Sequence, residues 1–95
     1  MAAYAIFIRD RMRDPDEFAI YGQKGRAARG DHPLTPLAYY GAHETWEGEP
    51  AEGVVVLQFP TMEAARAWYN SPAYQDALVH RKKAADYRVL LVEGL

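Results

Sequence analysis

The chain has 95 residues, of which 49% are apolar and 25% charged, so it fits one folded domain and is not typical of a disordered segment. Its formal net charge of −2 argues against a general nucleic-acid binder, and no apolar run is long enough to span a membrane. It has no cysteine for a disulfide or thiolate site, and Met1–Ile8 lacks the pattern of a signal peptide, so we expect a cytoplasmic protein.

The amino-terminal third predicts a strand followed by a helix. Residues 4–9 form a short run that is apolar on both faces, which is typical of a strand. The helix should begin after Asp14, a good N-cap, with Pro15 at its first position and Glu17 at the spacing of a capping box. Residues 30–33, with a glycine and a proline, should end it. Its inward stripe is predicted to be Phe18, Tyr21 and Gly25 or Ala28.

The middle of the chain predicts two strands and the start of a second helix. Residues 37–46 alternate in polarity, which predicts a strand at a sheet edge, and residues 47–53 form an acidic turn. Residues 54–59 are apolar on both faces and predict a central strand. Thr61 should cap the second helix, which residues 70–72 interrupt.

The carboxy-terminal third completes the pattern. Ser71 as N-cap and Pro72 as first helical residue restart the helix as far as Arg81, and residues 86–93 predict a last strand. The order β-α-β-β-α-β predicts an α+β, ferredoxin-like fold for residues 1–95 as a single domain. Such a fold has a four-stranded antiparallel sheet with two helices on one face.

The strands predict a partner for the sheet. Those over residues 4–9, 54–59 and 86–93 carry apolar side chains on both faces, whereas the helices cover only one face. An uncovered apolar face would be a large exposed patch, which soluble monomers avoid. We therefore expect a homodimer packed sheet to sheet.

The second half of the chain carries a family resemblance. Residues 59–75 (FPTMEAARAWYNSPAYQ), followed by Arg81 and by residues 92–94 (VEG), resemble domain-of-unknown-function family 1330. That family comprises small bacterial proteins of the dimeric α/β-barrel (ferredoxin-like) superfamily. The resemblance is strong over residues 54–95 and looser over residues 4–21. It implies the fold and the dimer, but its motif is not a catalytic signature.

Two positions depart from the family pattern. Members often have Gly-Gly-Arg entering the second strand, where residues 36–43 read PLAYYGAH, and Glu before Phe-Pro, where this chain has Gln58. If that acid serves as a base elsewhere in the family, this protein lacks it. The superfamily places a cleft between helices and sheet, and several members use it for cofactor-free oxygenation or isomerisation of aromatic or acyl compounds.

Arg81 is the first candidate for ligand binding. It shares one helical face with Tyr74 and Leu78, so its guanidinium could hold a carboxylate or carbonyl in a cleft floored by Gln58 and walled by Tyr74 and Trp68. Alternatively, Arg81 is a last-turn cation that complements the helix dipole. Gln58 is alternatively held by a structural hydrogen bond, to Tyr74 or across the dimer.

His43 is the candidate catalytic residue, because histidine titrates near neutral pH, although a lone histidine on an edge strand can also be structural. His32, His43 and His80 have no metal-ligand spacing, so we expect no metal. The resemblance to a superfamily with cofactor-free enzymes implies that no cofactor is needed. Ser71 is explained better as a helix cap than as a nucleophile. The aromatic residues of these segments would form core or border the cleft.

Neither a nucleic acid nor a membrane is an expected partner. The basic run at residues 80–83 is short, and the strand over residues 54–59 carries one aromatic where RNA-binding modules of this fold need several. Two functions remain open. One is a dimeric, cofactor-free enzyme acting on an aromatic or acyl compound. The other is a non-enzymatic dimer that binds a ligand, haem or a partner protein, or that serves as an accessory module.

Overall fold

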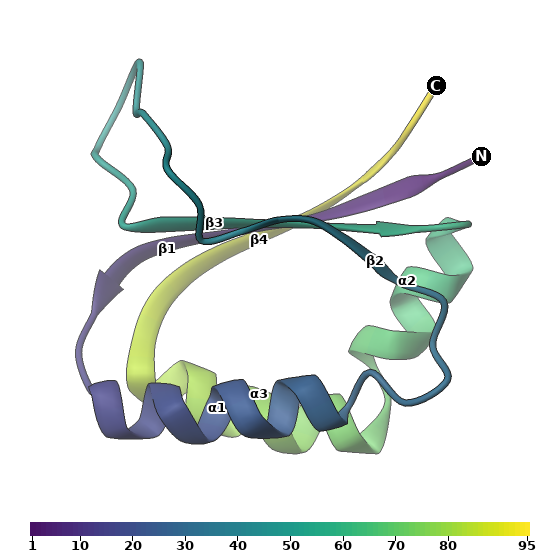
Figure 1. Ribbon diagram of the computed structural model, residues 1–95, viewed down its shortest axis with the longest axis horizontal. Helices are drawn as coiled ribbons and strands as arrows, with labels where there is room; N and C mark the ends of the chain where they lie inside the picture. Colours follow the sequence, from purple (N-terminus) through teal and green to yellow (C-terminus); the bar gives the residue numbers. More distant parts are fainter.

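The computed structural model describes residues 1–95. The elements, in chain order, are β1 (Ala3–Met12), α1 (Pro15–Ala27), β2 (Thr35–Tyr39), β3 (Gly53–Phe59), α2 (Met62–Tyr69), α3 (Pro72–Ala84) and β4 (Ala85–Glu93). The strands form one antiparallel sheet in the order β2-β3-β1-β4, and the three helices lie against one of its faces (Figure 1). The four-stranded antiparallel sheet predicted from the sequence is confirmed. The prediction of two helices on its face is wrong, because the interruption at residues 70–71 makes the second one two separate helices, α2 and α3.

Side-chain caps set the helix starts as predicted. Asp14, Thr61 and Ser71 each accept hydrogen bonds from backbone amides two or three residues further along. Pro15 and Pro72 occupy the first positions of α1 and α3, where a missing amide hydrogen costs nothing. The break between α2 and α3 is therefore encoded locally.

The second strand differs from its prediction. β2 covers residues 35–39 rather than 37–46, because Tyr40, with φ of 54°, turns the chain out of the ladder. Tyr39 pairs with Val55, near the start of β3 at Gly53, so residues 41–46 lie beyond the end of that strand. The residues that could pair with them are 47–52, an acidic stretch that contains glycine and proline. That stretch forms no strand, and residues 41–52 are a loop that projects beyond the sheet (Figure 1).

Three smaller differences concern element ends. β1 extends to Met12, where its last residues pair with the start of β4 across an irregularity, and α3 continues three residues past Arg81. Glu17 does not close a capping box. Its carboxylate instead binds the Nδ1 of His80 on α3, at 2.6 Å, because that charge-assisted partner lies directly beside it.

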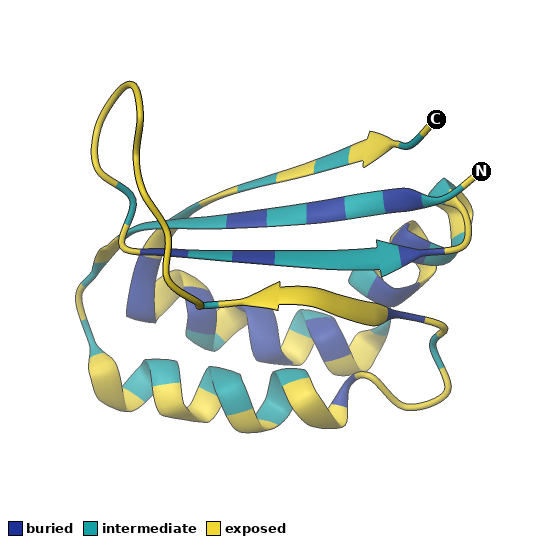
Figure 2. Ribbon diagram, turned by 45° about the horizontal axis from the view of Figure 1, so that its top comes forward, coloured by how far each residue is buried: buried dark blue, intermediate teal, exposed yellow.

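The core lies between the sheet and the pair α2–α3. Buried and half-buried residues alternate along β1 and β3, so every second side chain points to the helices (Figure 2). Phe7 and Phe59 of the sheet meet Trp68 of α2 and Tyr74 and Leu78 of α3 there. α1 contributes no buried residue between its ends.

The opposite sheet face is apolar and uncovered within one chain. Ile6 lies directly across from Val56 on one side and from Leu90 on the other, and Ala38 continues this row onto β2. Leu90 and Val92 are 52% and 49% exposed. None of the helices has the length and hydropathy needed to cross a bilayer.

Candidate functional site

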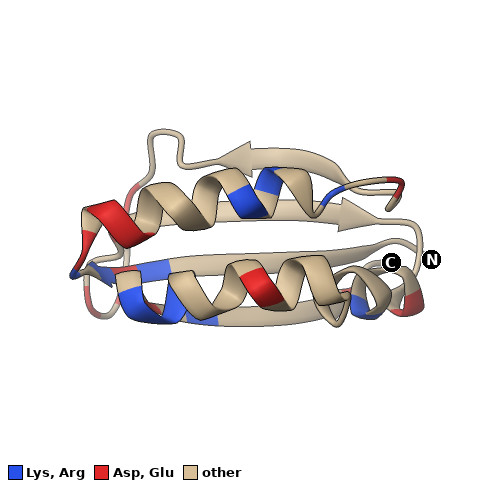
Figure 3. Ribbon diagram, turned by 90° about the horizontal axis from the view of Figure 1, so that it is seen from below, with Lys and Arg blue, Asp and Glu red and all other residues tan.

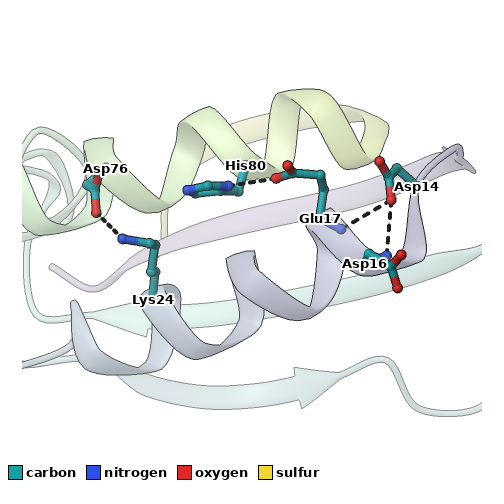
Figure 4. Close-up of polar contacts among 6 residues, drawn as sticks. All are labelled: Asp14, Asp16, Glu17, Lys24, Asp76 and His80. Atoms are coloured by element: carbon teal, nitrogen blue, oxygen red, sulfur yellow. Dashed lines mark hydrogen bonds and ion pairs between the residues drawn. The ribbon is translucent and has the colours of Figure 1, made fainter.

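α1 is attached to α3 rather than to the sheet. The two helices run antiparallel, so the acidic first turn of α1 lies beside the basic last turn of α3 (Figure 3). Glu17 binds His80, and Lys24 Nζ lies 2.6 Å from a carboxylate oxygen of Asp76 (Figure 4). Few residues of α1 approach the strands closely. This placement leaves room between α1 and the sheet.

A cavity of about 510 Å³ occupies that space. Phe7 of β1 and Val55 and Leu57 of β3 contribute its sheet side, whereas Trp68 and Tyr74 come from α2 and α3. Its remaining walls come from α1, the segment that follows it, and β2, and they include Tyr21, Gly22, Gly25, Arg26, Arg29 and Tyr39.

Two glycines of α1 help to keep the cavity open. Gly22 and Gly25 both line it, and each costs about 1 kcal/mol of helix stability relative to alanine. A Cβ at Gly25 would meet only the Tyr21 ring, at 3.9 Å, so the site has room for a side chain. The helix tolerates these glycines where a larger residue would fill the space above the sheet.

Aromatic rings form the inner wall. The rings of Trp68 and Tyr74 are 4.2 Å apart between centroids, Phe7 meets Trp68 edge-on at 6.1 Å, and Tyr21 meets Tyr74 edge-on at 6.3 Å. Such ring pairs are favourable and restrict side-chain motion. The wall is therefore rigid and apolar, with hydroxyl groups at its edge.

Arg81 lies behind this wall as a buried cation, 5% exposed. Its Nη1 donates to the Tyr74 hydroxyl at 3.2 Å, and that hydroxyl is 2.9 Å from the hydroxyl of Tyr21. The guanidinium also lies 5.5 Å from the ring centre of Phe7 and 5.1 Å from that of Tyr87. Ring faces and a phenol oxygen, with no carboxylate, stabilise the charge. Arg81 lies in the last turn of α3, as the dipole alternative requires, but it is buried and not exposed on the surface.

A second guanidinium, that of Arg9 on β1, lies against the rings of Phe18 and Tyr40. Arg9 is 5.1 Å from the ring centre of Phe18 and 5.0 Å from that of Tyr40, whose hydroxyl is hydrogen-bonded to that of Tyr87. The Tyr40 ring passes over Gly53, where a Cβ would come within 2.6 Å of it. Glycine at this position thus allows the ring to reach the cavity wall.

Burial determines the chemistry of these hydroxyls. It raises the pKa of Tyr21 and Tyr74, and likewise that of Tyr40 and Tyr87, so all four are neutral phenols near pH 7. No carboxylate or imidazole lines the cavity. The site can therefore hold a largely apolar molecule and donate hydrogen bonds to an acceptor on it, but its side chains offer no ordinary general base.

The structure brings three of the five predicted site residues together. Trp68 and Tyr74 line the cavity, and Arg81 contacts it through Tyr74. Gln58 does not form the floor, because strand alternation turns Leu57 toward the helices and Gln58 toward the other face. Gln58 instead lines a different depression, of about 410 Å³, together with residues of the segment between α1 and β2.

His43 lies outside the cavity, on the exposed loop instead of a strand. Its Nε2 is 2.8 Å from the carbonyl oxygen of Ala51, and its Nδ1 is 3.3 Å from that of Gly41. These two acceptors raise the pKa of His43, because both favour the protonated ring. The imidazole thus joins the two sides of the loop. No group of three or more histidine and acidic side chains is placed to hold a metal.

Sequence reasoning placed Tyr21 in the inward stripe of its helix, counted Tyr40 only among the aromatics that form core or border the cleft, and overlooked Gly22 and Arg26. One signal was present: Gly22 and Gly25 are spaced three apart, on the same helical face as Tyr21. Two glycines on one face of a helix indicate a face without side-chain bulk, which leaves space against the neighbouring element. The contribution of Tyr40 had no such signal, because it depends on the left-handed turn after β2.

Comparisons place the chain among known sequences and folds. The family model described as domain of unknown function (DUF1330) matches residues 2–95, and no curated protein matches. A solved protein of unknown function from Rhodopseudomonas palustris has a TM-score of 0.75 at 20% identity, covering 99% of this chain and 82% of that one.

Two further solved structures carry informative descriptions. A dimeric ferredoxin-like protein of unknown function from Jannaschia sp. CCS1 has a TM-score of 0.73 at 15% identity, covering 99% of this chain and 100% of that one. SnoaB, a cofactor-independent oxygenase from Streptomyces nogalater, has a TM-score of 0.68 at 12% identity, covering 99% and 93%. Identities this low demonstrate a shared fold alone.

Proposed function

The chain belongs to the family described as domain of unknown function (DUF1330), and from that premise we propose that it is a cytoplasmic homodimer that binds a small aromatic or acyl compound. The observation that carries the proposal is the cavity beneath α1, whose volume of about 510 Å³ is that of a typical small-molecule site. Its lining of aromatic rings with a few polar groups is the usual composition of such sites. The lack of cysteine is compatible with the reducing cytoplasm.

Tryptophan fluorescence tests the binding. Trp68 lines the cavity and Trp46, on the loop, is 87% exposed, so Trp46→Phe leaves Trp68 as the only indole reporter. A bicyclic aromatic probe, 2-isopropenylnaphthalene, should quench Trp68 saturably in this background. Gly25→Leu fills the cavity from α1 and should abolish the quenching while the far-ultraviolet circular dichroism stays unchanged. Saturable quenching that survives Gly25→Leu would place binding elsewhere.

The homodimer rests on the open sheet face. Ile6, Val56 and Leu90 form one row of an apolar surface that the helices do not cover, and soluble chains seldom leave such a surface in water. Several proteins of similar fold are described as dimeric. Light scattering should give about twice the chain mass of 10.7 kDa. Val56→Arg, on this face, should yield monomers, whereas Ile20→Arg on α1 should not; a parent protein of single-chain mass would refute the dimer.

A cofactor-free enzyme is the second candidate function. The guanidinium of Arg81, acting through the hydroxyls of Tyr74 and Tyr21, would stabilise negative charge on a bound oxygen, as oxyanion sites do. SnoaB, of similar fold, is described as a cofactor-independent oxygenase. Proton nuclear magnetic resonance of 2-acetylnaphthalene in D₂O tests this function. Deuteroxide from the solvent removes a methyl proton beside the carbonyl, and D₂O then deuterates the resulting enolate. Enolate stabilisation by the protein would accelerate this exchange, and a protein that only binds would leave its rate unchanged.

A further inference from the structure

The polar side chains that line the cavity are mainly hydrogen-bond donors. They comprise two guanidinium groups, one indole N–H and four phenols, and they include no carboxylate, amide or imidazole. Arg26 and Arg29 form no ion pair with a carboxylate. Guanidinium and indole groups can only donate hydrogen bonds. A ligand that satisfies these walls must therefore bring acceptors.

Counting protons along the Arg81–Tyr74–Tyr21 chain identifies one donor that has no acceptor in the protein. Arg81 has no acceptor atom, so the Tyr74 oxygen accepts its hydrogen. The Tyr74–Tyr21 contact of 2.9 Å uses one of the two hydroxyl protons. The other proton is left over, whichever hydroxyl donates in that contact.

Burial decides which hydroxyl keeps the spare proton. Tyr74 is 1% exposed, whereas Tyr21 is only half-buried, on the cavity side of α1. A buried hydroxyl without an acceptor is costly, which favours donation from Tyr74 to Tyr21 and leaves the proton of Tyr21 available. Hydrogen bonds in such a chain polarise one another, and the cation at its start makes Tyr21 a stronger donor.

Trp68 supplies a second donor without an acceptor. Its indole nitrogen is fully buried and has no hydrogen-bond partner, while the residue lines the same cavity. Such unsatisfied buried groups are rare in folded proteins and call for a specific explanation. A ligand acceptor would reach this buried nitrogen only after a shift of the Trp68 ring, so Tyr21 offers the donor that a ligand can meet directly.

We propose that the ligand carries an oxygen acceptor attached to its aromatic or acyl body, and that the Tyr21 hydroxyl is the donor that binds this oxygen. The proposal rests on the proposed binding function and deepens it by defining the ligand class. The oxygen belongs to a neutral carbonyl or to a carboxylate, for which Arg26 and Arg29 at the cavity wall provide favourable charge. The raised pKa of Tyr21 keeps its hydroxyl protonated, as a donor must be.

An isosteric pair of probes tests the proposal in the Trp46→Phe background. In 2-acetylnaphthalene a carbonyl oxygen replaces the terminal carbon of 2-isopropenylnaphthalene, so the two probes differ in one acceptor. The parent should bind the ketone about tenfold more tightly, which is the usual value of one such hydrogen bond. Tyr21→Phe should reduce that ratio to about one while the affinity for the hydrocarbon stays unchanged, which also establishes that the variant is folded.

Two further variants identify the donor. Tyr69→Phe is the matched control, because Tyr69 packs on Tyr74 but does not line the cavity, and it should keep the tenfold ratio. Tyr74→Phe retains the Tyr21 hydroxyl and should keep most of the ratio. Loss of the ratio in Tyr74→Phe alone would overturn the assignment to Tyr21.

The remaining outcomes distinguish the acceptor proposal from the proposed binding function on which it rests. Equal affinities of the parent for ketone and hydrocarbon would overturn the acceptor requirement and leave cavity binding intact. If neither the ketone nor the hydrocarbon binds, both proposals are overturned. A third probe, 2-naphthoate, distinguishes the two sources of the oxygen: tighter binding than the ketone, lost on Arg26→Gln with Arg29→Gln, assigns a carboxylate. Weaker binding assigns a neutral carbonyl.

Discussion

α1 and α3 have the same length and the same start but opposite roles. Each has 13 residues, a side-chain N-cap and a proline at its first position. α3 buries five residues against the sheet, whereas α1 buries none. The difference lies in the inward face, where α3 carries Tyr74, Leu78 and Arg81, and α1 carries Gly22 and Gly25.

This contrast separates fold from site. α3 brings large side chains into the core and thereby supplies folding energy, in proportion to the apolar area that it buries. α1 buries no residue and so contributes little of this energy, but it covers the cavity. Contacts of Glu17 and Lys24 with α3 hold the helix in place. Helix formation and helix burial are therefore independent properties of this sequence.

The largest expected effect comes from truncating one aliphatic side chain on each helix. Leu78→Ala removes a side chain that is 5% exposed and should lower the free energy of unfolding by about 3 kcal/mol. Ile20→Ala on α1, which is 37% exposed, should cost less than about 1 kcal/mol. Urea unfolding at one fixed protein concentration measures both. Equal losses would contradict the division of roles.

Arg81→Lys should give the next largest effect. Lysine keeps the charge but loses the planar group that lies over Phe7 and Tyr87 while it donates to Tyr74, so we expect a loss of about 1–2 kcal/mol. Lys82→Ala, one residue further along and exposed, should change the stability by less than about 0.5 kcal/mol. If Arg81 acted only on the helix dipole, lysine would replace it without loss.

Gly25→Ala should stabilise the protein. Its new methyl group meets only the Tyr21 ring, at an ordinary contact distance, and alanine improves helix propensity, so the gain should be about 0.5–1 kcal/mol. Thermal unfolding followed by circular dichroism measures it. Destabilisation would mean that α1 is already packed at this position and that the space beneath it is occupied.

The smallest effect concerns the ion pair between Lys24 and Asp76. The hydrogen bond from Lys24 lowers the pKa of Asp76 below 3.8, so the folded state favours the ionised carboxylate. Its contribution to stability is present above the unfolded pKa and is lost as the pH falls through the folded one. Asp76→Asn should therefore lower the melting temperature slightly at pH 7 and not at all at pH 2. A difference that persists in acid would exclude this charge effect.

Local signals in the sequence were sufficient for most of the fold. Asp14, Thr61 and Ser71 are caps whose partners lie within three residues, so their environment is contained in the sequence itself. The apolar strands 4–9, 54–59 and 86–93 were recognised for the same reason. The second strand was misplaced because the alternation along residues 37–46 does not show which residues could pair with it. Its partner strand, β3, begins only at Gly53, so the residues after Tyr40 have no strand beside them.

The candidate site was predictable only in part. The helical spacing of Tyr74, Leu78 and Arg81 places them on one face, and the structure buries all three. Gln58 failed as a floor because the two faces of a central apolar strand look alike in the sequence, and only packing against the helices distinguishes them. Tyr21 enters the site from α1, whose distance from the sheet is set by its contacts with α3, and Tyr40 enters it from the left-handed turn after β2.

The sequence by itself determined where the helices begin, where α2 and α3 separate and which strands are apolar on both faces, since these features depend on neighbours a few residues away. The tertiary structure alone decided the height of α1 above the sheet, the side of β3 that faces the helices and the burial of Arg81 among rings from three elements. Those properties arise from contacts between residues far apart in the chain, whose relative placement no local spacing encodes.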